Sequence, residues 1–544
     1  MHSTMMNVPL SVNHLLERAG ALFPDREIIS RRPDRTLVRH TYRQWHQRTL
    51  QLASALRAAG IGKGDRVATL CWNHHVHLEC YFGIPACGAV MHTLNLRLTG
   101  QEIGWIAAHA EDRFLIIDDI LLPLYRQFEH LHRFERVIVV PFSGEPVAAD
   151  GVDDYEQFIA GQDAGAFEFL PHDENDPISL CYTSGTTGSP KGVAYSHRST
   201  VLHALSASLT DHWGLRSQDV VMPVTPMFHA NAWGVPYGAV MCGAGFVFPG
   251  PNLHADDLLD LITEAPSTLA LGVPTIWMSL VQTYEASRDP GHPNHGRWKL
   301  PKSMRSLVGG AAVPEALARA CDAMGMHMLQ GWGMTETSPL ATVSYLPAAL
   351  QDVSHDERMR RTAMAGIPVP LVELRIRGED GANAPRDGQS VGEIQVRGPY
   401  ITGSYYGLPV TEDKFSEDGF LRTGDVGTQD AYGFVQITDR TKDVIKSGGE
   451  WISSVALENA LMGHPAILEA AVVPIPDVKW SERPLGCVVF KPGKTATPEQ
   501  LHEHLLQNGF AKWQLPERYE VIAEIPRTST GKFWKMKLRE QFPH

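Results

Sequence analysis

The chain is poor in several features that mark secreted, membrane-spanning or nucleic-acid-binding proteins. Its seven cysteines are dispersed over 544 residues and form no Cys-x-x-Cys pair, which argues against a disulfide framework and a thiol-rich zinc site. No apolar run approaches the ~20 residues that a membrane-spanning helix needs. The 48 basic and 61 acidic residues give a formal net charge of −13, which argues against a broad surface for nucleic acid or anionic membranes.

The remaining composition is that of a folded globular protein. Hydrophobic residues make up 43% and charged residues 20% of the chain, values typical of soluble domains. The first residues lack the basic stretch followed by an apolar one that marks a secretion signal. The final residues, QFPH, do not match a peroxisomal targeting signal. We therefore expect a cytoplasmic enzyme whose partners are small molecules.

One cluster of histidines has the composition of a possible metal-binding site. His74, His75 and His77 are followed closely by Cys80. The segment from His74 to Ala86 has the pattern of an amphipathic helix, and no second ligand cluster accompanies it. We therefore interpret these histidines as surface and packing residues rather than metal ligands.

The pattern of apolar runs predicts a multidomain α/β protein. Strand-length runs, for example at 66–72 and 113–119, alternate with helical patterns over most of the chain, which predicts largely parallel, buried sheets. From about Leu371, short strands bounded by Gly and Asp predict a small antiparallel, β-barrel-like unit. We expect a large N-terminal domain over 1–438 and a small, mobile α+β domain over 439–544.

The strongest motif is Tyr182-Thr-Ser-Gly-Thr-Thr-Gly-Ser-Pro-Lys-Gly192, directly after the apolar run 178–181. Glycines let the backbone approach an anion, amides and hydroxyls donate to phosphate oxygens, and the lysine adds charge. A strand before the motif and a helix-like segment after it predict a phosphate-binding loop. It is not a Walker loop, because its lysine follows a proline and precedes a glycine. The residues expected to contact phosphate are Thr183, Ser184, Gly185, Thr186, Thr187, Gly188 and Lys191.

Four further segments contain polar, charged or aromatic residues of kinds that bind ligands. Gln330-Gly-Trp-Gly-Met-Thr-Glu336 brings an aromatic ring, a hydroxyl and a carboxylate together, which suits adenine stacking and Mg²⁺. Phe420–Asp425 ends in a carboxylate suited to ribose hydroxyls. Asp439–Gly449 mixes charges with a double glycine, as a hinge needs, and Pro526–Lys532 presents a lysine on a loop. Taken alone, each segment also fits a turn with solvated charges.

Taken together and in this order, these segments resemble the adenylate-forming superfamily of acyl-CoA synthetases, luciferases and peptide-synthetase adenylation domains. The likeness spans essentially the whole chain. It includes the residues of three further motifs, Tyr195–Ser199, Val224–Trp233 and Ile445–Ser454. Within the superfamily the chain is similar to bacterial medium- and long-chain fatty acyl-CoA synthetases and to methylthiopropionate-CoA ligases. The resemblance implies a two-step ligase. A carboxylate attacks the α-phosphate of ATP and releases pyrophosphate, and coenzyme A then displaces AMP from the acyl-adenylate.

The resemblance also implies roles for individual residues. Thr183 and Glu336 would hold Mg²⁺, and Lys532 would bridge the substrate carboxylate and the α-phosphate. Asp425 and Arg440 would hold the ribose. The residues expected at the adenine and the rest of the ATP site are Gly310, Ala311, Gln330, Gly331, Trp332, Gly333, Met334 and Thr335.

In enzymes of this kind the small domain rotates between the two steps. The resemblance places the hinge at Asp439 and Lys442 and brings the Gly448–Gly449 loop toward coenzyme A, since a double glycine leaves the thiol's path open. Lys446 belongs to the same loop region. Trp451 fits either a contact with coenzyme A or a hydrophobic staple at the following helix.

The acid-binding side has fewer defined residues. Trp233 matches a tryptophan that gates the fatty-acid tunnel in one related group, although plain core packing fits it as well. Gly234 and Gly238 would leave room for a chain. His229 fits a place near the carboxylate or packing on Phe228. No charged residue clearly faces the expected tunnel, which favours apolar acids, with aryl and short-chain acids as alternatives.

Other enzyme classes make distinguishable predictions. A phosphotransferase or ATPase would release the γ-phosphate rather than pyrophosphate. A thioesterase or acyltransferase would need a nucleophile, and the chain has no Gly-x-Ser-x-Gly elbow. A luciferase-like monooxygenase would need oxygen instead of coenzyme A, and a nucleotide sensor would lack Lys532 or Glu336. Relatives in the fatty-acid group are often dimers, so we expect a homodimer.

Overall fold

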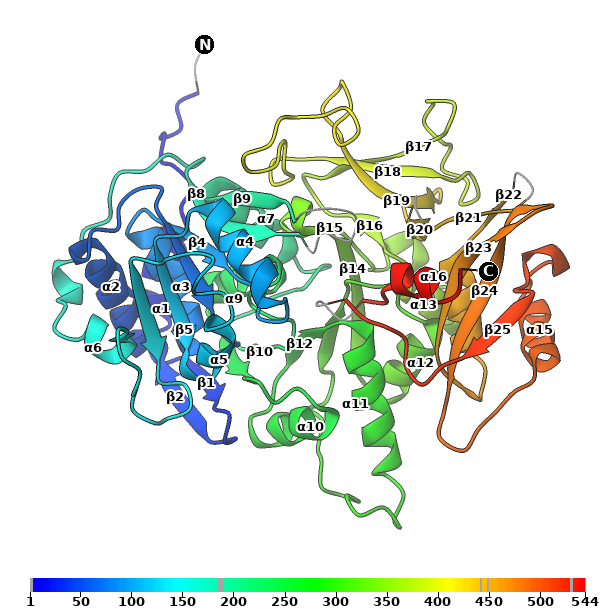
Figure 1. Ribbon diagram of the computed structural model, residues 1–544, viewed down its shortest axis with the longest axis horizontal. Helices are drawn as coiled ribbons and strands as arrows, with labels where there is room; N and C mark the ends of the chain where they lie inside the picture. The colour runs from blue at the N-terminus through cyan, green and yellow to red at the C-terminus, as the bar shows by residue number, and fades with distance from the viewer. Residues whose placement is uncertain (1–2, 184–189, 441–442, 448–449, 529–531, 544) are drawn as a thin grey trace.

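The computed structural model describes residues 3–183, 190–440, 443–447, 450–528 and 532–543, and the side chains of 450 and 451 lie outside that description. Within the described residues the chain forms four sheets. Two large sheets build the left and centre of Figure 1, an antiparallel sheet lies above them, and the C-terminal unit lies at the right. The predicted α/β fold with a separate small α+β unit is confirmed.

The first large sheet has the strand order β7-β6-β5-β3-β4-β8-β9 and is parallel except for the β8–β9 hairpin. Its central strands are buried along nearly their full length, as the continuous apolar runs predict. Its strands are β3 Arg66–Leu70, β4 Val90–Thr93, β5 Phe114–Asp118, β6 Arg136–Val140, β7 Asp153–Asp154, β8 Pro177–Tyr182 and β9 Gly192–Ser196.

The second large sheet has the order β16-β15-β14-β13-β12-β10-β11-β1-β2. It is parallel from β14 to β1, with antiparallel strands at both edges. Its strands are β1 Glu27–Arg31, β2 Leu37–Thr41, β10 Val220–Pro223, β11 Gly245–Phe248, β12 Leu269–Gly272, β13 Arg305–Val308, β14 His327–Gly333, β15 Leu340–Val343 and β16 Ile367–Pro368.

Helices cover these sheets, and the largest apolar cluster lies between them. That cluster joins Ile116 and Ile138 of the first sheet to Phe246 and Leu271 of the second. The helices of the large part are α1 Val12–Leu22, α2 Tyr42–Ala58, α3 His75–Ala86, α4 Gly100–Ala110, α5 Leu122–Tyr125, α6 Tyr155–Ile159, α7 His197–Ala207, α8 Ala230–Trp233, α9 Val235–Cys242, α10 Ala255–Glu264, α11 Pro274–Ala286, α12 Glu315–Ala323 and α13 His355–Thr362.

Helix α3 corrects one expectation from the sequence. Every residue from Val76 to Ala86 is buried, so the predicted amphipathic pattern is wrong, because the helix is packed on all sides within the core. The histidines before and within it are packing residues, with no surface role for His74 or His77, both fully buried. Helix α4 begins with a capping box of Thr99 and Glu102.

The antiparallel unit and the C-terminal unit follow the predicted change of pattern. The strands of the antiparallel unit pair in sequence order and are β17 Glu373–Arg377, β18 Gly392–Arg397, β19 Leu421–Gln429 and β20 Val435–Arg440. The C-terminal sheet has the order β22-β21-β24-β23, with β25 beside β24. Its elements are β21 Ile445–Ser447, β22 Glu450–Ile452, α14 Ser454–Met462, β23 Ile467–Asp477, β24 Ser481–Phe490, α15 Pro498–Gln507, β25 Arg518–Val521 and α16 Lys535–Gln541.

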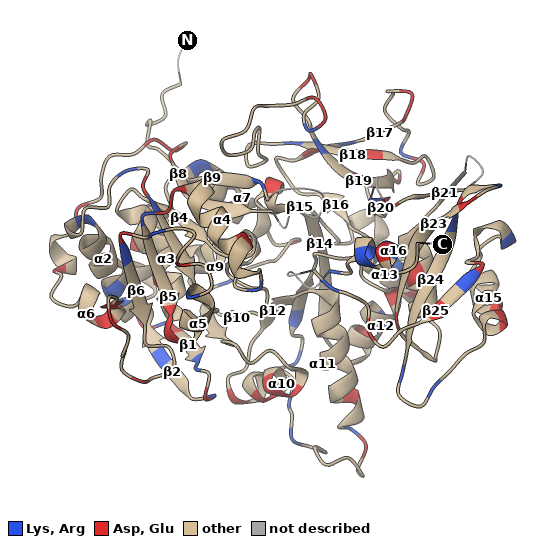
Figure 2. Ribbon diagram, in the orientation of Figure 1, with Lys and Arg blue, Asp and Glu red and all other residues tan. Residues whose placement is uncertain are grey.

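Figure 2 shows basic and acidic residues interspersed over both parts of the molecule in this view. Among the described residues, no helix has the length and apolar character to cross a membrane.

Candidate active site

A cavity of about 1830 Å³ lies between the large part and the C-terminal unit. Most of the residues singled out from the sequence meet there, although they come from segments more than three hundred positions apart. The predicted residues that line it are Thr183, Lys191, His229, Trp233, Gly310, Ala311, Gln330, Gly331, Trp332, Gly333, Met334, Thr335, Glu336, Asp425, Asp439, Arg440 and Lys532.

The predicted phosphate loop connects two antiparallel strands. The main-chain N–H of Thr183 donates to the carbonyl of Lys191 at 2.9 Å, and the N–H of Lys191 donates to the Thr183 hydroxyl at 3.2 Å. Residues 184–189, and with them Ser184 to Gly188, lie outside the described residues. The prediction of a helix-like segment directly after the loop was wrong, because strand β9 follows and pairs with β8 before α7 begins.

Tyr405 contacts both Glu336 and Lys191, which are predicted to bind Mg²⁺ and phosphate, respectively. The Tyr405 hydroxyl donates to Oε1 of Glu336 at 2.8 Å, and the Lys191 ammonium lies 4.8 Å from the centre of the Tyr405 ring. Glu336 is 6% exposed and belongs to a short turn at 335–337. The Tyr195 hydroxyl holds that turn from β9 by donating to the carbonyl of Thr335 at 2.6 Å. Carboxylate and cation are thus fixed at neighbouring points of the cavity.

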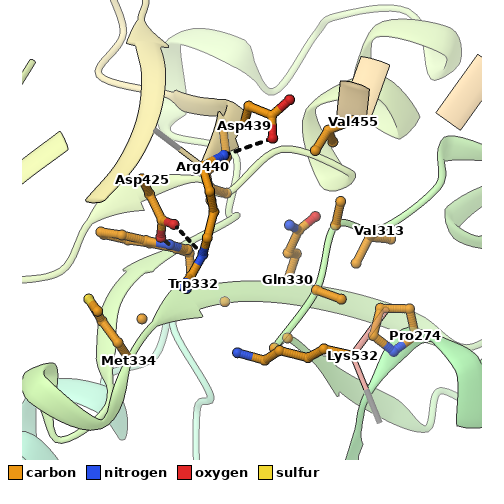
Figure 3. Close-up of a pocket in the computed structure, with 18 of the residues that line it drawn as sticks. Pro274, Val313, Gln330, Trp332, Met334, Asp425, Asp439, Arg440, Val455 and Lys532 are labelled. Atoms are coloured by element: carbon orange, nitrogen blue, oxygen red, sulfur yellow. Dashed lines mark hydrogen bonds and ion pairs between the residues drawn. The ribbon is translucent and has the colours of Figure 1, made fainter. Parts of the chain in front are cut away.

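Sheet register brings the two predicted ribose residues together. Asp425 on β19 is directly opposite Arg440 on β20, and Nε of Arg440 lies 2.9 Å from Oδ1 of Asp425. The indole N–H of Trp332 donates to Oδ2 of the same carboxylate at 2.9 Å. Figure 3 shows these three side chains joined on one side of the cavity, with Lys532 extending into it below Gln330. Trp332 is buried in the adjoining apolar cluster, so its ring is held firmly.

Lys532 is one of the cations that line the cavity. A Cβ placed on Gly310 would lie in ordinary van der Waals contact, 3.8 Å from Cε of Lys532 and 3.9 Å from Cζ2 of Trp233, so these three residues are neighbours in the cavity. Burial, reinforced by repulsion from Arg440, lowers the pKa of Lys532 from 10.5 to about 8, although Asp425 and Glu336 act in the opposite direction.

His229 and Trp233 flank that lysine on an unusual turn. Residues 230–234 all have φ between 42° and 72°, a left-handed conformation that costs roughly 1–2 kcal/mol for each non-glycine residue. Asn231 holds the turn, since its amide donates to the Ser179 hydroxyl at 3.0 Å on β8. Burial, with repulsion from Lys532 and Arg97, lowers the pKa of His229 to about 3, so the imidazole is neutral at pH 7.

Gly234 and Gly238 are not among the residues that line the cavity. A Cβ on Gly234 would lie 2.8 Å from the ring of His203, and one on Gly238 would lie 2.9 Å from the Ser208 hydroxyl. Both neighbours belong to or directly follow α7. The two glycines therefore allow α7 and the 234–242 segment to pack closely, and this replaces the expectation that they leave room for a chain.

The hinge and coenzyme A residues are placed only in part. Asp439 is 2% exposed, and its Oδ2 accepts the N–H of Ser454 at 2.9 Å, so the end of β20 is tied to the start of α14. Burial raises the pKa of Asp439. Lys446 lies on β21 outside the cavity lining, with its ammonium 3.8 Å from the Glu379 carboxylate. Lys442, Gly448, Gly449 and the side chain of Trp451 lie outside the described residues.

Tyr405 and Trp213 are among the aromatic residues of the cavity lining that the sequence interpretation missed. Tyr405 sits in Gly-Ser-Tyr-Tyr-Gly, where two tyrosines between glycines give a weak signal without their spatial partners. Trp213 lines the cavity and packs edge-on against His203, whose ring also contacts the Gly234 turn. No local pattern around Trp213 indicates a binding role.

Comparison with known families agrees with this arrangement. Residues 16–406 match the family described as AMP-binding enzyme, and residues 456–532 match the AMP-binding enzyme C-terminal domain. The boundary predicted at 438/439 falls between the two matches.

Similar proteins extend over the whole chain. A long-chain-fatty-acid–CoA ligase of Thermus thermophilus is 47% identical over 99% of this chain and 97% of its own. A 3-methylmercaptopropionyl-CoA ligase of Ruegeria pomeroyi is 41% identical over 100% of this chain and 99% of its own. A medium-chain-fatty-acid–CoA ligase of Ectopseudomonas oleovorans is 38% identical over 100% and 98%.

Solved structures agree in fold. The anthranilate CoA ligase AuaEII in complex with anthranoyl-AMP has a TM-score of 0.86 at 25% identity and covers 98% of each chain. ATP-bound MatB from Rhodopseudomonas palustris has a TM-score of 0.80 at 26% identity and covers 98% of this chain and 99% of its own.

Proposed function

The chain belongs to the AMP-binding enzymes and is an acyl-CoA ligase, and we propose that it activates medium- to long-chain fatty acids. The observation that supports this choice is the apolar character of the cavity beside Trp233. The Trp233 ring lies 3.6 Å from the Cβ position of Gly309, and Leu340 lies 2.9 Å from that of Gly331. The further apolar side chains of this lining are Trp213, Leu307, Val308, Leu329 and Pro339.

The charge arrangement suits the first half-reaction. A fatty acid and ATP are both anions, and negative charge grows on the phosphorus as the carboxylate oxygen attacks it. A fixed cation in a dry cavity stabilises that charge better than water does. Lys532 is the cation positioned for this role. The neutral imidazole of His229 beside it donates or accepts a hydrogen bond without adding charge.

The phosphate side fits Mg²⁺. Thr183 supplies a hydroxyl and Glu336 a carboxylate, and oxygen ligands of this kind are those that Mg²⁺ accepts together with phosphate oxygens. The Tyr405 hydrogen bond uses one oxygen of Glu336 and orients the carboxylate. We propose that these residues hold the ion, which when bound would screen the phosphate charges.

The nucleoside side is proposed to bind through Asp425, Arg440 and the backbone of 330–335. Each carboxylate oxygen accepts more than one hydrogen bond, so the contacts to Trp332 and Arg440 leave Asp425 able to accept a ribose hydroxyl. Gly310 and Ala311 line the same cavity and are proposed to contact adenine.

The second half-reaction is proposed to need rotation of residues 439–544 about Asp439 and Lys442. In the present structure Lys532 lies in the cavity while Lys446 lies outside its lining, the arrangement expected for adenylation. Rotation would withdraw Lys532 and bring the Gly448–Gly449 loop to the acyl-adenylate. The coenzyme A thiol then attacks the carbonyl, and AMP leaves.

A second candidate acid is 3-(methylthio)propionate, favoured by the 41% identity to the Ruegeria pomeroyi ligase over both whole chains. A pyrophosphate-release assay with ATP, Mg²⁺ and coenzyme A separates the candidates. The panel comprises propionate, methylthiopropionate, C6 to C16 acids, benzoate and cinnamate. The proposal predicts the highest kcat/KM with acids of C6 or longer. A maximum at methylthiopropionate or an aryl acid would overturn the fatty-acid assignment while keeping the chemistry.

Two expectations concern the protein as a whole. We propose a homodimer, as in relatives of the fatty-acid group, and a cytoplasmic location. Light scattering after size-exclusion chromatography tests the first, with a mass near twice 60.1 kDa expected. A monomer at micromolar concentration would contradict it. Cell fractionation tests the second, with recovery in the membrane fraction as the contrary result.

A further inference from the structure

The turn that follows β3, residues 71–74, lies at a distinctive point of the seven-stranded sheet. Strand β4 pairs with one side of β3, and β5 crosses back to pair with the other. Such a switch in winding opens a crevice at the carboxyl ends of parallel strands, where many α/β proteins bind a ligand. Here the turn instead contacts the loop 223–228 of the other large sheet.

Asn73 makes that contact. Its side chain is 4% exposed. Its amide N–H groups donate to the carbonyls of Pro223 and Thr225 at 2.7 and 2.9 Å, and its amide oxygen accepts the N–H of Met227 at 2.8 Å. All three hydrogen bonds of the Asn73 side chain are therefore made to one loop, 150 to 154 positions away in the sequence.

The turn itself is held rigidly by the neighbouring strand. Oδ2 of Asp118, at the end of β5, accepts the N–H of Trp72 at 2.8 Å, and Oδ1 lies 2.8 Å from Nε2 of His74. Cys71, His74 and Asp118 are also the one group of side chains, among the described residues, close enough together to be considered as metal ligands. The hydrogen bonds explain this group as the support of the turn.

Two further side chains of the same region hold the end of the loop. The Tyr81 hydroxyl donates to the carbonyl of Met227 at 2.5 Å, and the Thr93 hydroxyl donates to the carbonyl of Phe228 at 3.1 Å. Both are buried. The next residue is His229, which lines the cavity beside Lys532.

We propose that Asn73 is a positioning residue for the acid-binding end of the active site. It lies outside the cavity lining and acts by fixing the loop 223–228, which sets the place of His229 and the following turn. The inference rests on the proposed role of the His229 side of the cavity in binding the acid. Preorganisation of this kind matters because a displacement of about 1 Å of a catalytic group can lower a rate about 100-fold.

The test compares Asn73→Ala with Asn252→Ala. Asn252 is a matched control, because its amide also donates to two backbone carbonyls, those of Arg32 and Pro33, and it does not line the cavity. We expect Asn73→Ala to lower kcat/KM for the acid by about 10- to 100-fold and to change the KM for ATP by less than about twofold. Asn252→Ala is expected to change neither parameter by more than about twofold.

A double variant tests whether the substitution of Asn73 changes the acid kinetics through His229. If Asn73 acts through His229, the combined loss in Asn73→Ala/His229→Ala is smaller than the product of the two single losses. Tyr81→Phe, which keeps the ring and removes one bond to the same loop, should change the acid parameter in the same direction by a smaller factor.

Three results would overturn the inference. One is an equal rise in the KM values of acid and ATP, and another is a loss in Asn73→Ala that Asn252→Ala reproduces. The third is a fully multiplicative double variant. If Asn73→Ala does not fold, an unchanged kcat/KM for the acid in a stable Tyr81→Phe would reject the role of the loop. Failure of the proposed function is distinguishable, because wild-type enzyme would then show its highest kcat/KM with methylthiopropionate or an aryl acid rather than with acids of C6 or longer.

Discussion

The pKa of Lys532 gives the sharpest quantitative prediction. In its proposed role the ammonium must be protonated to stabilise the charge on the α-phosphate, yet burial and the nearby Arg440 lower its pKa from 10.5 to about 8. This lowering corresponds to about 3 kcal/mol by which the surroundings disfavour the charged ammonium. As pH rises through about 8, the free enzyme therefore loses the proton that adenylation needs.

The measurement is kcat/KM for ATP from pyrophosphate release between pH 6 and pH 10, because this parameter reports ionisations of the free enzyme. We expect it to fall about tenfold per pH unit above a midpoint near pH 8. In Lys532→Arg the guanidinium stays protonated, so the remaining activity should lack that decline.

Variants of the neighbours of Lys532 test the cause of its lowered pKa. Arg440 lowers the pKa of Lys532 and Asp425 raises it, so Arg440→Met should move the midpoint to higher pH and Asp425→Asn to lower pH. Both residues are proposed ligands of ribose, so only the midpoint is compared and not the absolute rate. An unchanged decline in Lys532→Arg, or midpoint shifts of the opposite sign, would refute the reasoning.

Three further predictions address the other parts of the mechanism. Lys532→Ala should reduce adenylation by about 10²- to 10³-fold and keep much of thioester formation from preformed acyl-adenylate; equal losses in both half-reactions would contradict its role. Tyr405→Phe should weaken Mn²⁺ binding in a direct titration by about 10-fold, because ligand-orienting partners typically contribute that much to metal affinity, and unchanged affinity would exclude this role. Lys442→Pro should slow thioester formation more than adenylation in single-turnover assays, whereas a uniform effect would remove it from the hinge.

Local sequence patterns predicted most of the elements because their causes are local. The apolar runs and the Gly- and Asp-bounded strands after Leu371 each depend on residues close in the sequence. The Gly- and Thr-rich loop after β8, predicted to bind phosphate, can be picked out in the sequence for the same reason. The element after it cannot be, because Gly192–Ser196 becomes a strand through pairing with β8, which the local pattern does not reveal.

The missed features depend on distant partners. Tyr405 and Glu336 are 69 positions apart, and Asn73 and Met227 are 154 apart. Neither contact can be recognised from the residues next to either partner in the sequence. Gly234 was expected to open space for a substrate, yet its place against His203 follows from helix packing that no periodicity indicates.

The central claim is that the reaction passes through an acyl-adenylate. The most direct test traces the carboxylate oxygen atoms of the acid into the products. If a carboxylate oxygen attacks the α-phosphate, that oxygen stays on phosphorus when coenzyme A displaces AMP. With [¹⁸O₂]dodecanoate, ATP, Mg²⁺ and coenzyme A, mass spectrometry should find one ¹⁸O in AMP, none in pyrophosphate, and dodecanoyl-CoA with one ¹⁸O. Unlabelled AMP, or ¹⁸O in orthophosphate, would contradict an acyl-adenylate intermediate and the roles assigned to Lys532 and the residues around it.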